Sequence, residues 1–339
     1  MKIAFFPYES TENKYVNIII EILKSINGIK VYPFVPLDYL RFSRKMWGAN
    51  VVWLNWFELD HGRVKNMLKI FVLILLKVTG KKIIYTLHNR KLHNKDTSIL
   101  SRLLQNSIYY FCDIIVIHSK ISVHDLPKKY IVKTQYIPHP NYIGEYGDSK
   151  GKEASTKLRL LFLGQVKPYK NIELLIKTAS EWNPNEVELT IAGKPISEEY
   201  KSELLNLAAG KNIKFVFEFV KDDEMSEYLG NCDLLVLPYD ISSSLNSGTV
   251  ILAFSYAKTV ICPLIGTVGD LTNKEFLTYT YNDSTEHLAA LKQQIQKATT
   301  LKSNDNQIFD NWGQIMYNEV YQSNSKDKIK QIIEQRILK

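Results

Sequence analysis

Residues 159–171 read RLLFLGQVKPYKN, an apolar run that leaves through Gly164 into a loop carrying Lys167 and Lys170. A short apolar run bounded by turn residues favours a buried β-strand. The residues after Asn171 have helical spacing, and a helix start beside lysine suits a phosphate group. The stretch therefore predicts either a phosphate-binding loop in an α/β domain or, on spacing alone, a solvated connection.

The same alternation of strand and helix extends toward the N-terminus. Because the expected strands are apolar throughout, they predict a mainly parallel sheet covered by helices on both faces, which is the α/β class. We expect strands at Lys2–Phe6, Lys30–Phe34, Val51–Leu54, Lys82–Leu87, Ile114–Ile117 and Thr134–Ile137. We expect helices at Lys14–Ser25, Arg63–Thr79 and Leu100–Phe111.

A second, similar domain follows a break in this pattern. His139–Lys157 is rich in glycine, serine and charge, which is typical of a linker. A chain of 339 residues also favours two domains. After the linker we expect strands at Arg159–Leu163, Glu188–Ala192, Ile213–Phe217, Leu234–Pro238 and Thr259–Cys262. The intervening helices are expected at Asn171–Glu181, Glu198–Ala209, Asp223–Asn231 and Ser247–Tyr256, with a helical tail from Ser284.

Composition limits the possible partners and compartments. Residues 1–150 hold 22 Lys+Arg against 11 Asp+Glu, whereas the rest of the chain holds 21 against 24. A basic first half favours nucleic acid or an acidic lipid surface, and a solvated face is the alternative; no nucleic-acid-binding motif accompanies it. Cys112, Cys232 and Cys262 lie far apart in apolar runs, so buried free thiols are expected. The start lacks a signal-peptide pattern, and Met67–Val78 is too short to span a bilayer.

Chemistry is expected where the strands end, because parallel α/β sheets bind ligands at their carboxyl edge. Residues 237–249, LPYDISSSLNSGT, place Ser247, Gly248 and Thr249 at a helix start, where free N–H groups attract phosphate. Gly193 and Lys194 directly follow another expected strand, at the same edge of the sheet as these loops. A helix cap or an ordinary loop is the alternative for each.

Polar residues also follow two strands of the first half. Glu58 follows one strand, and His88 with Asn89 follows the next, so an acid/base cluster is predicted there. A histidine that only bonds its loop is the alternative. The chain has no GxxxxGK[ST] loop and no strand followed by GxGxxG, which excludes the common nucleotide-binding fingerprints.

Six segments together resemble the GT-B fold glycosyltransferases, in particular the family-four-like group that builds bacterial exopolysaccharides, capsules and O-antigens. They are ENKYVNIIIEILKS (12–25), VVWLNWFE (51–58), YTLHNRKLHN (85–94), YIPHPNY (136–142), GQVKPYKN (164–171) and DLLVLPYDISSSLNSGTVILAFSYAKTVICP (233–263). The resemblance implies two Rossmann-like domains facing each other across a cleft. Residues 1–140 would bind the acceptor, 158–305 the nucleotide-sugar, and the helices of 306–339 would cross back over the domains.

The resemblance also implies roles for single residues. The donor diphosphate would be bound by Gly164, Lys167, Lys170, Ser247, Gly248 and Thr249, and the nucleoside by Gly193 and Lys194. His88 and Glu58 would be catalytic, with Asn89 and His139 on the acceptor side. The group usually carries two glutamates where this chain has Ser244 and Leu252, and a glycine where it has Asn171.

The implied activity is transfer of a hexose-type sugar from a nucleotide diphosphate donor to a lipid-diphosphate-linked saccharide in cell-surface polysaccharide synthesis. No D-x-D occurs, so we expect no metal and no cofactor beyond the nucleotide-sugar co-substrate. The expected location is cytoplasmic, peripheral on the inner face of the membrane, with Met67–Val78 and Lys69, Lys77, Lys81 and Lys82 as the dock. The alternatives are a non-catalytic nucleotide-sugar-binding subunit and a nucleotide-sugar epimerase of the same fold.

Overall fold

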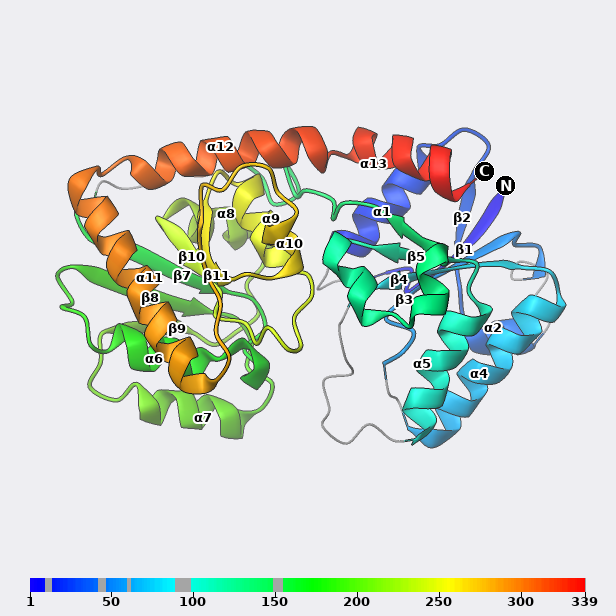
Figure 1. Cartoon of the computed structure of the whole chain (residues 1–339), viewed down its shortest axis with the longest axis horizontal. Coiled ribbons are helices and arrows are strands. Elements are labelled where there is room, and N and C mark those ends of the chain that lie inside the picture. Colours follow the sequence, from blue (N-terminus) through cyan, green and yellow to red (C-terminus); the bar gives the residue numbers. More distant parts are fainter. Residues whose placement is uncertain (10–13, 42–46, 60–61, 89–98, 149–154, 339) are drawn as a thin grey trace. The chain divides into compact units, whose positions relative to one another are not determined.

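The computed structural model of the chain describes residues 1–9, 14–41, 47–59, 62–88, 99–148 and 155–338. It divides into two units, each built on a parallel six-stranded sheet (Figure 1). The first unit is Met1–Pro140 with Asn324–Lys339, and the second is Asn141–Ser323. The α/β class with two similar parallel-sheet domains is thereby confirmed.

The first sheet has the strand order β2-β1-β3-β4-β5-β6, with every neighbouring pair parallel. Its strands agree with the expected ones to within one residue at each end. They are β1 (Lys2–Phe6), β2 (Lys30–Pro33), β3 (Val51–Asn55), β4 (Lys82–Leu87), β5 (Ile114–Ile117) and β6 (Thr134–Tyr136). β3 and β4 are buried almost throughout, as strands covered on both faces should be.

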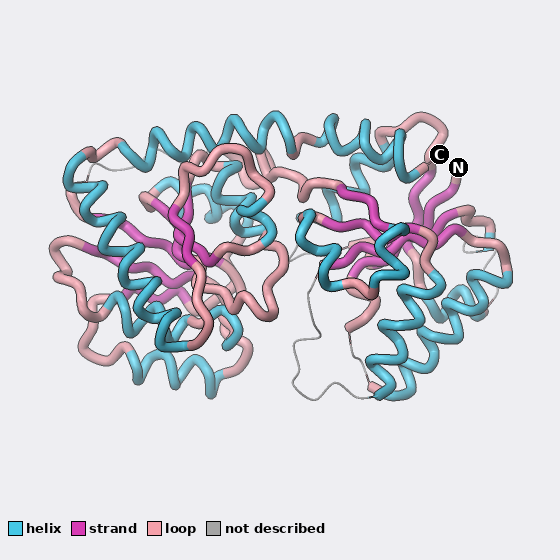
Figure 2. The backbone as a smooth tube through the Cα atoms, viewed as in Figure 1, coloured by secondary structure: helices cyan, strands magenta, loops and turns pink. Residues whose placement is uncertain are grey.

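The helices of the first unit cover both faces of this sheet. α4 (Arg63–Val78) and α5 (Ile99–Phe111) pack side by side, whereas α1 (Lys14–Lys24) packs with α13 (Lys326–Ile332) (Figures 1 and 2). The Lys326 ammonium pairs with the Glu21 carboxylate at 2.8 Å. The remaining elements are α2 (Pro36–Leu40), the 3₁₀ helices η1 (Lys120–Asp125) and η2 (Lys128–Lys133), and a final π turn, Ile333–Ile337.

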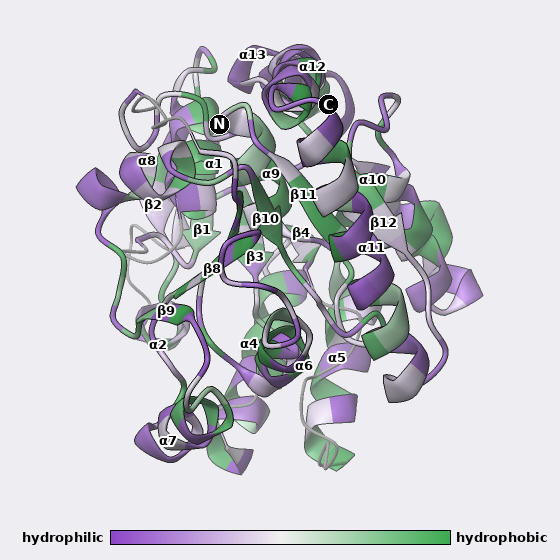
Figure 3. Ribbon diagram, turned by 90° about the vertical axis from the view of Figure 1, so that its left-hand side faces the viewer, coloured by the Kyte–Doolittle hydropathy of each residue, from purple (hydrophilic) through white to green (hydrophobic). Residues whose placement is uncertain are grey.

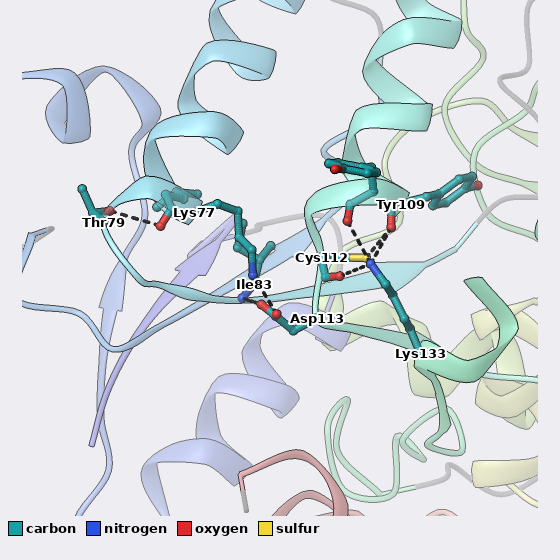
Figure 4. Close-up of polar contacts among 9 residues, drawn as sticks. Lys77, Thr79, Ile83, Tyr109, Cys112, Asp113 and Lys133 are labelled. Carbon is teal, nitrogen blue, oxygen red and sulfur yellow. Dashed lines mark hydrogen bonds and ion pairs between the residues drawn. The ribbon is translucent and has the colours of Figure 1, made fainter. Parts of the chain in front are cut away.

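Two groups of polar contacts, around Asp113 and around Lys133, attach α4 and α5 to the sheet (Figure 4). The Asp113 carboxylate pairs with the Lys77 ammonium at 2.7 Å and accepts a hydrogen bond from the Ile83 backbone N–H at 2.8 Å. At the end of α5, the Lys133 ammonium donates to the carbonyl oxygens of Tyr109, Tyr110 and Cys112. Lysine is stabilising there because the last carbonyls of a helix have no partner within the helix.

The second sheet has the order β12-β11-β10-β7-β8-β9, again with parallel pairs. Its strands are β7 (Leu158–Leu163), β8 (Val187–Ala192), β9 (Ile213–Val216), β10 (Leu234–Val236), β11 (Thr259–Pro263) and β12 (Leu277–Tyr279). Figure 3 shows β10 and β11 in the green of hydrophobic residues, consistent with their burial. The three-residue β12 is not predicted from the sequence, because it is too short to show a period.

The helices of the second unit begin close to the expected positions. They are α6 (Ile172–Ala179), α7 (Glu198–Leu207), α8 (Asp222–Gly230), α9 (Gly248–Ser255), α10 (Gly266–Gly269), α11 (Ser284–Asn304) and α12 (Ile308–Ser323), with η3 (Pro168–Lys170) before α6. A buried ion pair joins α11 to the sheet, because the Lys302 ammonium lies 2.8 Å from the Asp233 carboxylate. That carboxylate also accepts the Arg159 backbone N–H.

The helices of the C-terminal segment fall in both units. α12 belongs to the second unit and α13 to the first, with the boundary after Ser323. The three cysteines are free and buried, as expected. Within the described residues, no helix has both the length and the apolarity needed to cross a bilayer.

Candidate active site

The carboxyl edge of the second sheet brings three distant segments together. Gly164, just after β7, has a φ of +125°, a conformation that favours glycine. A Cβ at this position would lie 3.1 Å from the Lys170 Nζ and 3.8 Å from the Thr249 Oγ1. The glycine exit, the loop lysine and the first turn of α9 therefore meet at one point.

The loop after β8 lies against the same point. Gly193 has a φ of +147°, and a Cβ there would overlap the carbonyl oxygen of Gly164. The Val166 N–H donates to the Lys194 carbonyl at 3.0 Å, and the Ile196 N–H donates back to the Val166 carbonyl at 3.0 Å. Only glycine at 193 allows this approach, so its role here is steric. The Lys194 side chain is exposed.

Lys170 is a buried cation that has no counter-ion among the described residues. Its ammonium has no hydrogen bond or ion pair to any described residue, and it lies 5.6 Å from the Phe162 ring centroid and 5.7 Å from that of Tyr239. Burial, together with the nearby Lys167 charge, lowers the pKa of Lys170 from 10.5 to about 8. A buried unpaired charge is unfavourable, so this arrangement is suited to an anionic ligand.

The start of α9 supplies the second half of an anion site. The Ser247 hydroxyl accepts the Val250 N–H at 3.2 Å and donates to the Tyr239 hydroxyl at 3.2 Å. The Ser247 N–H already donates to the Thr267 hydroxyl at 2.8 Å. The N–H groups of Gly248 and Thr249 have no acceptor in the described part of the chain. Of the three residues expected to bind phosphate through their backbone, two thus have a free donor.

The loop between β10 and α9 is held by residues that the sequence did not single out. The Tyr281 hydroxyl donates to the Tyr239 carbonyl at 2.9 Å and accepts the Ile241 N–H at 3.0 Å. The Tyr281 ring stacks on the His287 ring, with centroids 3.8 Å apart. Tyr239 in turn lies between Lys170 and Ser247, so Tyr281 fixes a loop that contacts both halves of the anion site.

Asn171 stands where the resembling group usually has glycine, and its backbone conformation explains why asparagine is tolerated there. Its φ is +52°, in the left-handed region that asparagine adopts more readily than most residues. Its side-chain amide donates to the Pro238 carbonyl at 2.9 Å, which ties the lysine loop to the end of β10. The substitution therefore preserves the backbone conformation and adds a contact.

A cluster of three histidines lies at the carboxyl edge of the first sheet. His88 follows β4, His118 follows β5 and His139 follows β6, and each ring lies 5.0–5.2 Å from the Tyr15 ring on α1. Burial lowers the pKa of His118 to about 4 and that of His139 to about 3, and it lowers the pKa of His88 well below its usual value. All three are therefore neutral at pH 7.

Hydrogen bonds make His118 a structural residue. Its Nδ1–H donates to the Ile137 carbonyl at 2.8 Å, and its Nε2 accepts the Tyr15 hydroxyl at 2.9 Å. Tyr15 also bonds Thr86, whose hydroxyl accepts the Trp53 indole N–H at 2.9 Å. Both ring nitrogens of His118 are used, and nothing in the sequence distinguished this histidine from the other two.

His88 has a different pattern, with a hydrogen bond at only one ring nitrogen within the described chain. Its Nε2 lies 3.2 Å from the Asn55 Oδ1, while the Asn55 amide nitrogen donates to the Phe6 carbonyl. The Nε2 must therefore carry the proton, which places the lone pair on Nδ1. Nδ1 has no partner among the described residues. The Trp56 ring stacks on His88 at 4.0 Å, with the backbone at a positive φ of 50° that a bulky residue rarely adopts.

Glu58 does not join His88. Its carboxylate lies with Tyr85 and Lys69, and burial is the largest cause of its raised pKa. The Tyr85 hydroxyl and the Lys69 charge both favour the charged carboxylate and offset part of the effect of burial on this pKa. Tyr85 and Thr86 are consecutive in β4 and so point to opposite faces of the sheet. Glu58 is therefore on the side of α4 and α5, whereas His88 is on the side of Tyr15, and the predicted acid/base cluster is not formed.

The other predicted acceptor residues have separate outcomes. Asn89 lies outside the described residues. His139 belongs to the histidine cluster, where its Nδ1–H donates to the Pro140 carbonyl at 3.0 Å and its own carbonyl accepts the Asn324 amide at 2.7 Å. No group of three or more His, Cys, Asp or Glu side chains within the described ranges is arranged to hold a metal ion.

Comparison with known proteins confirms the resemblance to GT-B glycosyltransferases. Residues 148–262 match the family described as glycosyl transferases group 1, a stretch that holds Gly164, Lys170 and the start of α9. The chain is 28% identical over 196 residues to a GDP-mannose:glycolipid 4-β-D-mannosyltransferase of Xanthomonas campestris pv. campestris, covering 57% of this chain and 53% of that protein. A protein of the same name from a second strain is 31% identical over 107 residues, covering 31% and 30%. The chain thus spans about half or less of these relatives.

Solved structures share the fold over the whole chain. Anabaena HepE in complex with UDP superposes with a TM-score of 0.71 at 14% identity, covering all of both chains. Sucrose-phosphate synthase from Thermosynechococcus elongatus gives a TM-score of 0.75 at 13% identity, covering 99% of this chain and 98% of that one. At such identities the likeness shows the GT-B fold.

Proposed function

We propose that this chain, which has the GT-B fold and a glycosyl transferases group 1 region, transfers a hexose from a nucleotide diphosphate sugar to a lipid-linked saccharide. The observation that carries the proposal is the convergence of Gly164, Lys170 and Thr249, where a buried ammonium and helix N–H groups have no partner within the described structure. GDP-mannose and a glycolipid are the first donor and acceptor to test, because the curated relatives are named for them. We further propose a role in cell-surface polysaccharide synthesis.

The anion site matches the chemistry that sugar transfer requires. When the bond between the sugar and the diphosphate breaks, negative charge develops on the leaving phosphate. Fixed N–H groups and a cation aimed at that charge lower the barrier, and losing one such donor costs about 3 kcal/mol. Lys170 supplies the cation, and Gly248 with Thr249 supplies the N–H groups. We infer that the reaction needs no metal ion because these residues meet the charge themselves.

We assign the acceptor to the first unit, with His88 as the group that takes the proton of the attacking hydroxyl. A general base must be unprotonated at working pH and must have a free lone pair. His88 meets both conditions, since its pKa is lowered and its Nδ1 is unpaired within the described chain. Glu58 is not assigned this role, because it lies on the other face of the sheet among Tyr85 and Lys69.

A non-catalytic nucleotide-sugar-binding subunit is the second candidate. Ser244 and Leu252 stand where the resembling group has glutamates, and Leu252 is buried in α9, so neither position offers a carboxylate. If the chain only binds, its anion site will hold a nucleoside diphosphate and no donor will be consumed.

The test is a two-step assay on the purified protein. Thermal shift with GDP, UDP, ADP and dTDP identifies the base, because a ligand that binds only the folded state raises the melting temperature. Release of diphosphate from the matching nucleotide sugar is then measured with and without a lipid-linked acceptor, and with EDTA. We expect stabilisation by GDP and acceptor-dependent, EDTA-insensitive release. Stabilisation without release from any donor would support the binding subunit, and loss of release with EDTA would refute metal independence.

A further inference from the structure

Helices α4 and α5 carry apolar side chains on faces that point away from the sheet. On α4 they recur every three or four residues, the spacing of one helical face. Several are almost fully exposed, with 82% of Val64, 78% of Val78 and 88% of Ile99 open to solvent. The exposed set is Val64, Met67, Phe71, Ile74 and Val78 on α4, with Ile99, Leu103 and Tyr110 on α5. We call these eight residues the α4–α5 apolar face.

This face is separate from the hydrophobic core. Val72, Leu73 and Leu76 of α4 are completely buried, and they lie on the side of the helix opposite the exposed residues. α4 thus has two apolar sides, of which packing against the sheet uses one. An exposed apolar surface of this kind marks a site of contact with another molecule or a membrane.

The two helices form one continuous surface. They pack side by side along their length, and the Asn66 side chain of α4 lies 3.5 Å from the Ser101 hydroxyl of α5 (Figure 1). Because both helices bury their inner sides on the sheet, their outer sides face the same way. The exposed residues of α5 therefore extend the stripe of α4 sideways into a patch two helices wide.

The charges around the patch favour an anionic lipid surface. Neither α4 nor α5 contains an acidic residue, and Arg63 and Lys65 are exposed at the start of α4. Lys128 and Lys129 are exposed on η2, which is joined to the end of α5 by Lys133. An apolar face with cations at its border is typical of helices that lie in a membrane interface.

The lysines expected to make this contact are used elsewhere. Lys69 is buried and donates to the carbonyl oxygens of Phe57 and Leu59, and Lys77 pairs with Asp113. Lys81 donates to the Trp47 carbonyl and Lys82 to the Ile337 carbonyl. A purely electrostatic dock on these four residues is therefore not available, and the apolar side chains must provide most of the contact.

The patch also borders the proposed acceptor site. In a β-α-β connection the helix runs opposite to the strands, so α4 and α5 begin at the carboxyl edge of the sheet. His88 lies at that edge, directly after β4. The N-terminal turns of the two helices, with Val64, Met67 and Ile99, are therefore on the same edge of the unit as the unpaired His88 nitrogen.

We propose that the α4–α5 apolar face inserts into the lipid surface that holds the acceptor, with Arg63, Lys65, Lys128 and Lys129 over the headgroups. The lipid-linked acceptor rests on the proposed function, whereas insertion itself does not. The surface should bind vesicles that contain neither donor nor acceptor.

The experiment is flotation of the full chain with vesicles of phosphatidylcholine alone or mixed with phosphatidylglycerol, at low and high salt. Met67→Ser/Phe71→Ser is the test variant, and Phe219→Ser, an exposed aromatic of the second unit, is the matched control. We expect binding to the anionic vesicles that survives in part at high salt, and a decrease of about 10-fold or more in the test variant, because apolar burial scales with the area removed from water. The control should bind like the parent protein.

Several outcomes would overturn the proposal. These are no binding to either vesicle, binding that high salt abolishes completely, and equal binding by both variants. Self-association that the double substitution removes, without vesicle binding, would instead make the face a protein interface. Circular dichroism and melting temperature verify that the variants fold. If vesicle binding follows the prediction but no donor is consumed, insertion stands and the transferase assignment fails.

Discussion

Replacing Lys170 by methionine removes a buried ammonium while keeping most of the side-chain volume. The decrease of the pKa from 10.5 to about 8 corresponds to about 3 kcal/mol against the charged form in the folded state. The Phe162 and Tyr239 rings offset part of this by about 1 kcal/mol each. Lys170→Met should therefore stabilise the ligand-free protein by about 1 kcal/mol, which is a rise of roughly 2–4 °C in melting temperature.

The size of this stabilisation depends on pH. Below pH 8, lysine is charged in both the folded and unfolded chain, so the parent protein carries the full cost of burial. Between pH 8 and 10.5 the folded lysine is neutral while the unfolded one still binds a proton, so the stability of the parent rises. The advantage of Lys170→Met should therefore be full at pH 7 and should decrease as the pH is raised above 8.

The same substitution should reduce transfer at least about 100-fold, since a preorganised donor to the leaving phosphate contributes about 3 kcal/mol. Lys177→Met, a change at an exposed lysine of α6, is the matched control and should alter neither property. Melting curves from pH 7 to 10 and initial rates on the two variants make the comparison. A Lys170→Met protein that is destabilised, or that keeps normal turnover, would refute the reading of Lys170 as an anion-binding residue.

Three further predictions concern the rest of the site. His88→Ala should leave GDP affinity unchanged in calorimetry and lower the transfer rate about 100-fold. In the parent enzyme, the decrease of turnover on the acid side should occur well below pH 6.5, because the pKa of His88 is lowered. A decrease of turnover near pH 6.5 would contradict this. Tyr281→Phe removes both hydroxyl bonds to the Tyr239–Ile241 backbone, so the donor KM should rise several-fold with little change in kcat; unchanged donor kinetics would rule out the positioning role. GDP affinity should fall as the pH rises above about 8, because Lys170 then loses its charge, and calorimetry of Lys170→Met should show no such decrease from this residue.

The sequence was sufficient for most of the fold because the strands are uniformly apolar. Runs such as Lys82–Leu87 are buried on both faces, and their ends were predicted to within one residue. β12 was missed because three residues cannot display a period, and the short α10 for the same reason. The assignment of α12 and α13 to different units depends on contacts such as Lys326 with Glu21, which are 305 residues apart and do not appear in local sequence patterns.

The proximity of the segments that we propose to bind the donor was predictable for a topological reason. Parallel strands end at one edge, so Gly164, Lys170 and the start of α9 had to lie near one another once the strands were placed. The predicted acid/base cluster of His88 and Glu58 is not formed, because the face of the sheet on which a residue lies depends on the path of the backbone after the strand ends. Tyr281 and Thr267 could not be found either, because they act through contacts with residues 20 to 42 positions away.

Polar groups that have no hydrogen-bond partner in the described structure identify the candidate site better than residue type does. In the histidine cluster, His118 is bonded at both ring nitrogens, whereas His88 keeps one lone pair free within the described chain. Around the anion site, Ser247 is fully bonded, whereas the Lys170 ammonium and the Gly248 N–H have no partner among the described residues. Such groups lower stability until a ligand binds them, so selection for folding alone would remove them.

Glu58 shows the limit of that criterion. Its carboxylate is also buried, but it lies beside Lys69 and the Tyr85 hydroxyl, and its raised pKa favours the neutral acid, which reduces the cost of burial without a ligand. An ammonium with a pKa of about 8 cannot lose its charge so easily at pH 7. Between two buried ionisable groups, the one that must stay charged is the one that requires a partner from outside the chain. For Lys170 that partner must be an anion, and the free N–H groups of α9 require the same.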